Sequence, residues 1–256
     1  MECGQPLFAI CPKPVFIVGA PRSGTSLFRQ ALGRHPQLWT SAAGDYLQPL
    51  FNALVEAWRQ GNRYGRYQWL AAQGVSEDEF WRYAGLGFNA LFSSRAGSRV
   101  WVEKTPDYSR YLVPLSLLFP GARFIHIHRD GRQAVSSMKQ HWGWSHRRAC
   151  HLWQNCTSAV LQFRENQPHR ILTLAFEQLM QQSDAAFELI FRFLKLEPHA
   201  GCARYIDKQG SSGADDPPLT NSGLMDQPAT RISWNWMQKQ WFEHTCGSLQ
   251  GKLGYR

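Results

Sequence analysis

The fold class of this chain is decided by the stretch GAPRSGTS at residues 19–26. Its two glycines have the GxxxxG spacing of a phosphate-binding loop, and it lies between the apolar run Val15–Val18 and a helical pattern that begins at Leu27. Backbone N–H groups of such a loop can converge on a phosphate, as can the hydroxyls of Thr25 and Ser26. The stretch therefore predicts the strand, loop and helix that open a parallel sheet, with an anion site at the turn. The alternative is a loop that only turns the chain, with Thr25 or Ser26 as helix cap.

The loop differs in two ways from the loops that bind nucleoside triphosphates. Those loops carry a lysine where this chain has Thr25, and here the cation lies within the loop, at Arg22. Phosphoryl-transfer proteins also hold magnesium with an acid at the end of a neighbouring strand, whereas the predicted strand 124–128 is followed first by Arg129. Both differences favour an anion site without a metal, built from arginine, hydroxyls and backbone N–H groups. Asp130 keeps a metal site open as the alternative.

Short apolar runs alternate with helical patterns along the rest of the chain. Beyond the first strand we expect strands at Arg99–Glu103, Arg123–His128 and Arg170–Ala175, which are rich in branched and aromatic residues. Helices are expected at about residues 46–60, 76–94, 108–118, 132–140, 147–165, 183–194 and 240–253. This alternation predicts an α/β fold of the P-loop-like, three-layer α/β/α type with a central parallel sheet.

A single domain over residues 1–256 is predicted, with two departures from the regular alternation. The segment Asp45–Ser98 has an almost entirely helical pattern, which predicts a helical cap inserted between the first two strands, above their carboxyl ends. Such caps commonly shape the substrate pocket of α/β proteins. The segment Gly201–Thr230 is rich in Gly, Ser, Asp and Pro, which predicts a long flexible loop that a ligand orders.

Charge and composition narrow the ligand and the location. The 256 residues carry a formal charge of +9, which suits an anionic ligand such as a nucleotide, a nucleic acid or an acidic membrane surface. No apolar run is long enough to cross a membrane, and the first residues lack the pattern of a signal peptide. The six cysteines lack the paired spacing of a zinc site or a disulfide framework. We therefore expect a cytoplasmic protein with reduced thiols and no stable membrane insertion.

The motifs resemble those of the sulfotransferases that use 3′-phosphoadenosine 5′-phosphosulfate (PAPS) as donor. Residues 21–26, PRSGTS, are similar to the loop that binds the 5′-phosphosulfate, and an arginine at the place of Arg22 is typical of the bacterial carbohydrate-type and tyrosylprotein branch. The family's second signature, an arginine after a strand and a serine eight residues later, is matched by Arg129 and Ser137. The resemblance implies that these two residues hold the 3′-phosphate. It also implies donor contacts from Arg22, Ser23, Gly24, Thr25 and Ser26.

Three further segments extend the resemblance over nearly the whole chain. They are WVEKTP at residues 101–106, LAFEQL at residues 174–179 and the ending at residues 246–255. Phe176 stands where many relatives have tyrosine, so the resemblance implies a ring that packs near the adenine without a hydroxyl. Arg231, which follows the long loop, is a candidate anion contact once the nucleotide binds.

The resemblance implies a metal-independent, in-line transfer of the sulfuryl group from PAPS to an acceptor hydroxyl or amine, which leaves the bisphosphate PAP. Because negative charge grows on the leaving 5′-phosphate, Arg22 and Lys104 are the candidate stabilising cations. An ion pair with Glu103 is the alternative for Lys104. Asp45 is the candidate base, although it fits the N-cap of the next helix equally well. His35 and Glu103 are the other candidate bases.

His126 and His128 lie two residues apart, so their side chains share one face of a strand. No further ligand follows at a recognisable spacing, and buried, hydrogen-bonded structural histidines are predicted rather than a metal pair.

Two other classes of function stay open at this point. One is a magnesium-dependent P-loop kinase or NTPase, and the other is a basic protein that binds nucleic acid or a membrane surface. The latter would use a compact basic cluster, of which His146–Arg148 is the example here. For the sulfotransferase we expect a small-molecule, glycan or peptide acceptor and no nucleic acid partner. Neither the acceptor nor the oligomeric state follows from the sequence.

Overall fold

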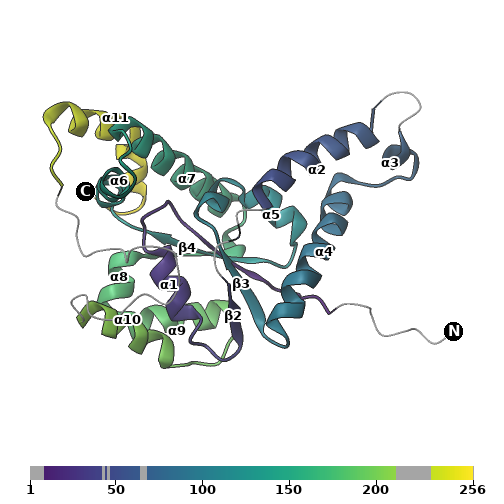
Figure 1. Ribbon diagram of the computed structural model, residues 1–256, viewed down its shortest axis with the longest axis horizontal. Coiled ribbons are helices and arrows are strands. Elements are labelled where there is room, and N and C mark those ends of the chain that lie inside the picture. The colour runs from purple at the N-terminus through teal and green to yellow at the C-terminus, as the bar shows by residue number, and fades with distance from the viewer. Residues whose placement is uncertain (1–8, 42–43, 45–46, 64–67, 212–231, 256) are drawn as a thin grey trace.

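A parallel sheet forms the centre of the protein, with its five described strands in the order β2-β3-β1-β4-β5 (Figure 1). The computed structural model describes residues 9–41, 44, 47–63, 68–211 and 232–255. The strands are β1 (Val15–Val18), β2 (Leu38–Thr40), β3 (Val100–Lys104), β4 (Arg123–His128) and β5 (Ile171–Ala175). Because each neighbouring pair is parallel, all carboxyl ends lie at one edge of the sheet, which is the edge where open α/β sheets bind ligands.

Both faces of the sheet are buried, as the continuous apolar character of the strands requires. Along β1, Val15 and Ile17 pack into one hydrophobic cluster, whereas Phe16 and Val18 pack into a second cluster on the opposite face. None of these four side chains is more than 1% exposed. The strand that leads into the phosphate-binding loop is therefore fixed from both sides.

Two helical layers enclose the sheet, and Figure 1 shows them above and below it. One layer contains α1 (Thr25–Leu32), α8 (Phe176–Gln181), α9 (Ser183–Leu194) and α10 (Gly201–Ser211), and the other contains α4 (Glu77–Ala96), α5 (Leu112–Leu118) and α7 (His146–Asn166). A third cluster joins α7 to α6 (Gly131–Trp142) and α11 (Trp236–Lys252). The remaining elements are α2 (Leu47–Gly61), α3 (Trp69–Ala72) and the 3-10 helices η1 (Pro106–Arg110) and η2 (Pro168–Arg170). The predicted three-layer α/β/α fold is confirmed.

The edge strand β2 was not predicted from the sequence. It has three residues and pairs with β3 through Leu38 and Val100. Such a short strand carries no periodic pattern of its own, and only Leu38 is buried among its residues. The helical segment that follows it is therefore inserted between the second and third strands along the chain.

The helical segment predicted as a cap has two parts with different roles. Helix α4 is a core helix, because Trp81 and Phe92 belong to the hydrophobic cluster on one face of the sheet. Gly85 also packs closely against α5: a Cβ at Gly85 would lie 2.0 Å from the carbonyl oxygen of Leu118. Helix α2 begins beside the carboxyl end of β3, where the N–H of Leu47 donates to the hydroxyl of Tyr108. Figure 1 shows α2 and α3 extending away from the sheet. The prediction that the whole segment lies above the sheet was wrong for α4.

The predicted loop at Gly201–Thr230 begins as a helix instead. Helix α10 covers Gly201–Ser211 and buries Cys202, Ala203 and Ile206 against the layer that contains α1. These three positions lie on one helical face, a signal that the Gly, Ser and Pro content of the following residues obscured. The remainder of that segment, 212–230, lies outside the described residues.

The last helix starts earlier than predicted because a capping box fixes its first turn. Asn235 accepts a hydrogen bond from the N–H of Gln238, whose side chain accepts one from the N–H of Asn235. In the described part of the chain, no helix is both long and apolar enough to cross a membrane.

The two β4 histidines are buried, as predicted, on the face of the sheet that α7 covers. His126 is 1% and His128 is 9% exposed, and their rings lie 5.5 Å apart. The prediction that they are hydrogen-bonded is not supported at Nδ1, which lacks a partner in both rings among the described residues. Burial lowers the pKa of His126 well below 6.5, with His128 and Arg164 acting in the same direction. Burial and Arg164 lower the pKa of His128 to about 4.

These pKa shifts predict a loss of stability in acid. Below the ordinary histidine pKa of 6.5, these histidines bind protons in the unfolded chain but stay neutral in the folded protein. The free energy of unfolding therefore falls as pH falls. The slope is at most about 1.4 kcal/mol per pH unit for each histidine. In His126→Leu, the unfolding free energy from urea titrations should depend less on pH between pH 6.5 and pH 5. The exposed His169→Asn serves as control, and an unchanged slope in His126→Leu would contradict the prediction.

Candidate functional site

The predicted phosphate-binding loop connects β1 to α1, and a different close contact requires glycine at each of its two glycine positions. Gly24 has a φ of +87°, and a Cβ there would lie 2.1 Å from the ring of Phe176. At Gly19, a Cβ would lie 2.2 Å from the carbonyl oxygen of Ile127. No larger side chain fits at either place without a shift of the backbone or of the ring. The two glycines of the GxxxxG spacing therefore allow two close contacts: Gly19 lies against β4, and Gly24 lies against the start of α8.

The helix α1 is capped by Gly24 in left-handed conformation, and no side chain makes a cap hydrogen bond. The alternative in which Thr25 or Ser26 serves as cap is therefore wrong. Thr25 is buried and Ser26 is exposed. The Oγ of Ser23 is fully buried and has no hydrogen-bond partner within the described ranges. A buried hydroxyl without a partner at the start of a helix indicates a place for an anion.

Ser109 holds the start of the loop, although it was not predicted as a site residue. Its Oγ accepts a hydrogen bond of 2.7 Å from the N–H of Gly19 and donates one of 2.9 Å to the carbonyl of the same residue. Ser109 is fully buried in η1, directly after β3. Its position after the WVEKTP segment was the only signal available. The first residue of the loop is thus fixed by the neighbouring strand connection.

A direct contact joins the two motifs. The Nε of Arg22 donates a hydrogen bond of 3.0 Å to the Oγ of Ser137, which lies on α6. Arg22 has a φ of +67°, and this left-handed conformation costs a non-glycine residue roughly 1–2 kcal/mol. Strained residues of this kind concentrate at functional sites. The loop is therefore in direct contact with α6, the helix that follows Arg129 and Asp130.

Arg129 supplies a buried cation at the carboxyl end of β4. It is 4% exposed, and its guanidinium lies over the ring of Phe176, 5.1 Å from the centroid. Its Nη1 makes no hydrogen bond with any described residue. A buried guanidinium is costly without a hydrogen-bonded anion. Of the two residues that the resemblance implies as 3′-phosphate contacts, Arg129 thus lies on Phe176 and Ser137 is bound to Arg22.

Lys104 ends β3, in register with Ile17 of β1, and is 8% exposed. This places it on the strand next to the phosphate-binding loop. Its neighbour Glu103 is 1% exposed and accepts hydrogen bonds at Oε1 from the N–H of Gly44, at 2.9 Å, and from the hydroxyl of Thr105, at 2.9 Å. One carboxylate oxygen of Glu103 is thus engaged in holding the segment that follows β2.

Two predicted site residues, Asp45 and Arg231, lie outside the described residues. His35, an alternative base, is buried and uses both ring nitrogens: Nδ1 accepts from the N–H of Gln37 and Nε2 donates to the carbonyl of Glu197. With both nitrogens bound to backbone, His35 is not available as a base. This removes His35 from the candidate bases, of which Asp45 and Glu103 are the carboxylates.

Asp130, the residue that kept a metal site open, is engaged by cations and amides. Its carboxylate pairs with Arg132 at 2.7 Å and accepts a hydrogen bond of 2.7 Å from Gln250. Burial alone would raise the pKa of Asp130, but these hydrogen bonds outweigh it and lower the pKa. The described residues contain no group of three or more His, Cys, Asp or Glu side chains that would suit a metal ion.

Comparison with known proteins places this chain in a family. Residues 14–200 match the family model described as Sulfotransferase family. A putative protein-tyrosine sulfotransferase of Caenorhabditis briggsae is 24% identical over 192 residues, which are 72% of this chain and 65% of the relative. The chain therefore spans less than two thirds of the length of that relative.

Two solved structures share the fold. The sulfotransferase domain of the olefin synthase of Synechococcus PCC 7002 has a TM-score of 0.63 at 18% identity, with 100% of this chain and 99% of that chain covered. Mouse sulfotransferase SULT7A1, complexed with PAP, has a TM-score of 0.61 at 13% identity, with 96% and 90% covered. Since the family model spans most of the chain and includes both motifs, this protein belongs to the sulfotransferase family.

Proposed function

We propose that the protein transfers the sulfuryl group of PAPS to a hydroxyl or amine of an acceptor, as a transferase of the EC 2.8.2 type. The observation that carries the proposal is the contact of Arg22 with Ser137, because it joins a loop suited to a 5′-phosphosulfate with a turn suited to a 3′-phosphate. A nucleotide with phosphates at both ends of its ribose matches this pair of sites. The PAP in the mouse relative's structure supports the same donor.

The donor would be held by residues from three strand ends. The 5′-phosphosulfate is assigned to the loop and the 3′-phosphate to the turn after β4, with Phe176 beside the adenine. Arg231 is an additional proposed anion contact. The assigned residues are Arg22, Ser23, Gly24, Thr25, Ser26, Arg129 and Ser137. The buried, unpartnered Oγ of Ser23 and Nη1 of Arg129 support this assignment, because each is a donor that an anion would satisfy.

The reaction proposed is an in-line substitution at sulfur. The bond from sulfur to the bridging oxygen of the 5′-phosphate breaks while a bond from sulfur to the acceptor oxygen or nitrogen forms. The acceptor proton passes to a base, and the departing electron pair stays on the phosphate of PAP. Arg22, Lys104 and the loop N–H groups would stabilise that charge, so no step requires a metal. Guanidinium remains protonated, which makes Arg22 an electrostatic rather than an acid catalyst.

Asp45 is the proposed base. Its neighbour Gly44 is fixed at the carboxyl end of β3 by hydrogen bonds to Glu103 and Thr105, at 2.9 and 3.1 Å. This position lies next to Lys104, the proposed contact of the sulfuryl group. In this proposal, an acceptor hydroxyl bound there would give its proton to Asp45 while Lys104 contacts the sulfuryl group.

The acceptor class is proposed only broadly, as a small molecule, a glycan or a peptide, with no nucleic acid partner. The rival P-loop kinase is disfavoured because Thr25 replaces the lysine and Asp130 is engaged by Arg132 and Gln250. A cytoplasmic location is proposed as well. It is supported by the free thiols of the five described cysteines, among them Cys150 and Cys246 at the contact of α7 and α11.

The first prediction concerns the 3′-phosphate. Replacing Arg129 by Ala removes a charge-assisted contact worth roughly 1.5–3 kcal/mol, which corresponds to about a tenfold to hundredfold loss of affinity for PAP. AMP, which lacks the 3′-phosphate, should bind with nearly unchanged affinity. Calorimetry with both ligands in the presence of EDTA measures the difference.

The exposed Arg192→Ala is the matched control for loss of one positive charge. Equal affinity of the unaltered protein for PAP and AMP would remove the assignment of Arg129 and Ser137. Binding of ATP with magnesium, without binding of PAP, would favour the kinase.

The second prediction concerns charge stabilisation in the transition state. Arg22→Ala and Lys104→Ala should lower turnover by a larger factor than they weaken PAP binding, because the other phosphate contacts persist in the product complex. Single-turnover rates with labelled PAPS, set beside calorimetric PAP affinities, provide the comparison. A parallel loss of both quantities would show that these cations only bind the donor.

The third prediction tests the base. Asp45→Asn should leave PAP affinity and the melting temperature unchanged while turnover falls by ~10²–10⁴. The acidic limb of the pH profile should vanish with the carboxylate. Near-normal turnover in Asp45→Asn would assign Asp45 to a structural role and make Glu103→Gln the next variant.

A further inference from the structure

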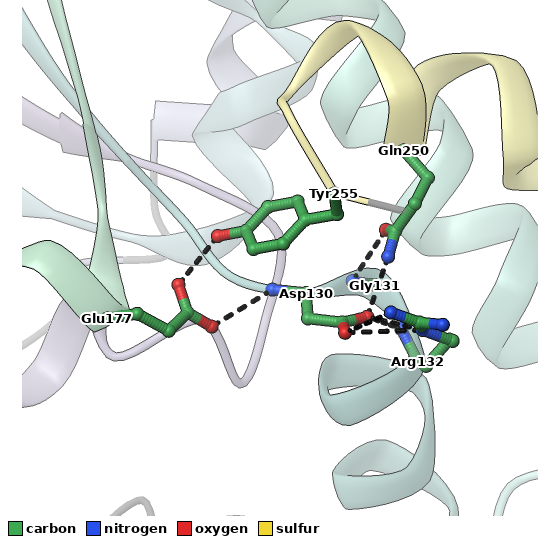
Figure 2. A network of polar contacts seen from close by, with 6 residues as sticks. All are labelled: Asp130, Gly131, Arg132, Glu177, Gln250 and Tyr255. Carbon is green, nitrogen blue, oxygen red and sulfur yellow. Dashed lines mark hydrogen bonds and ion pairs between the residues drawn. The ribbon is translucent and has the colours of Figure 1, made fainter.

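Side chains from the last helix and the residues after it hold the turn that carries Arg129 (Figure 2). Gln250 accepts a hydrogen bond of 2.9 Å from the N–H of Gly131 and donates one of 2.7 Å to Asp130. Tyr255 donates a hydrogen bond of 2.6 Å to Glu177. The other oxygen of Glu177 accepts from the N–H of Asp130 at 3.3 Å. The backbone N–H groups of the two residues after Arg129 are thus both bound by side chains from distant parts of the chain.

The same contacts occupy two acids close to Arg129, one adjacent to it in the chain and one bound to the N–H of Asp130. Asp130, its neighbour in sequence, pairs with Arg132 and accepts from Gln250. Glu177 follows Phe176, the ring on which the guanidinium of Arg129 lies, and its two oxygens are taken by Tyr255 and by the N–H of Asp130. Neither acid forms an ion pair with Arg129 in the described part of the protein, and Nη1 stays without a hydrogen bond. A cation kept from internal carboxylates retains its attraction for an external anion.

The close approach of the Gln250 side chain to the turn depends on glycine at position 131. It is 4% exposed, and a Cβ at Gly131 would lie 2.8 Å from its Oε1 and 2.8 Å from the ring of Trp153. Only glycine allows the amide this close to the turn. The ring of Tyr255 packs against His128 at 5.5 Å, which fixes the direction of its hydroxyl. Burial and Glu177 raise the pKa of Tyr255, so that the hydroxyl remains a donor.

We propose that Gln250 and Tyr255 are positioning residues for the donor's 3′-phosphate: they fix the turn at Asp130 and Gly131 and keep both acids off Arg129. This rests on the proposed function, because it presumes that Arg129 binds that phosphate. Neither residue touches the donor in this assignment. They act on the geometry and the charge around Arg129, although they lie far from it in the sequence.

The network should affect one end of the nucleotide only. The loop that takes the 5′-phosphate is held by the two hydrogen bonds between Ser109 and Gly19, and Ser109 belongs to η1, outside the network. None of the four hydrogen bonds from Gln250, Tyr255 and Glu177 ends on that loop. Loss of the network should therefore lower the preference for PAP over AMP, whereas a general loss of structure would weaken both ligands.

The test measures the ratio of PAP to AMP affinity in Tyr255→Phe and Gln250→Ala by calorimetry, together with melting temperatures. Tyr255→Phe removes one hydrogen bond and Gln250→Ala removes two. At about 1 kcal/mol for a hydrogen bond, each variant should lower the ratio about fivefold or more, with AMP affinity within about twofold of the unaltered protein. Matched controls are the exposed Tyr83→Phe and Gln240→Ala, the latter on the same helix as Gln250.

Glu177 provides a conservative pair of variants. In Glu177→Gln one oxygen can still accept from the N–H of Asp130 and the amide can donate to Tyr255, so the ratio should stay near its original value. Glu177→Ala removes both contacts and should lower the ratio as Tyr255→Phe does. This pair separates hydrogen bonding from the charge of Glu177.

The outcomes are distinct. If the unaltered protein does not prefer PAP over AMP, the proposed 3′-phosphate site fails, and this inference fails with it. If the unaltered protein prefers PAP and the Tyr255 and Gln250 variants keep the full ratio, the positioning role alone is refuted. Equal weakening of both ligands with a lower melting temperature also refutes it, in favour of a structural role. Should Gln250→Ala not fold, Tyr255→Phe decides, because it retains the ring.

Discussion

The burial of Arg129 without an internal anion is the constraint on which the arrangement of the site depends. A guanidinium that is 4% exposed loses most of its hydration, and its Nη1 recovers no hydrogen bond from the described residues. Such a group is tolerated where an anion completes it. The acids Asp130 and Glu177 are each bound to other partners, so neither pairs with this guanidinium in the described part of the chain. The anion site proposed at Arg129 rests on this arrangement.

Phe176 couples this cation to the phosphate-binding loop. Its ring lies beneath Arg129 and against Gly24, so the ends of β1, β4 and β5 meet at one aromatic side chain. A guanidinium over a ring is stabilised by about 0.5–2 kcal/mol, more as water is excluded. Phenylalanine supplies this packing without the hydroxyl that the family resemblance led us to expect at this position.

Prediction from the sequence was accurate for elements with a strong local pattern. The strand Arg123–His128 and the helix Ser183–Leu194 have the predicted bounds, because branched and aromatic residues identify the strand and an apolar period of 3.6 residues identifies the helix. Prediction failed for β2, whose three residues are a strand only through pairing with β3. It failed for α10 as well, because composition was averaged over a segment that is helical in its first part. The helix α4 was placed in a cap because periodicity shows an apolar face but not which surface that face covers.

By itself, the sequence determined the fold class, the glycine-bearing loop between β1 and α1, and the family, because each depends on residues close together in the chain. Only the tertiary structure decided which residues surround Arg129. Arg22 meets Ser137 across 115 positions, Ser109 meets Gly19 across 90, and Gln250 meets Asp130 across 120. Contacts at such separations leave no periodic signal, since they arise when parallel strands bring their carboxyl ends to one edge of the sheet. The physical reason is that charge balance in a buried site depends on neighbours in space, and these are set only once the layers have packed.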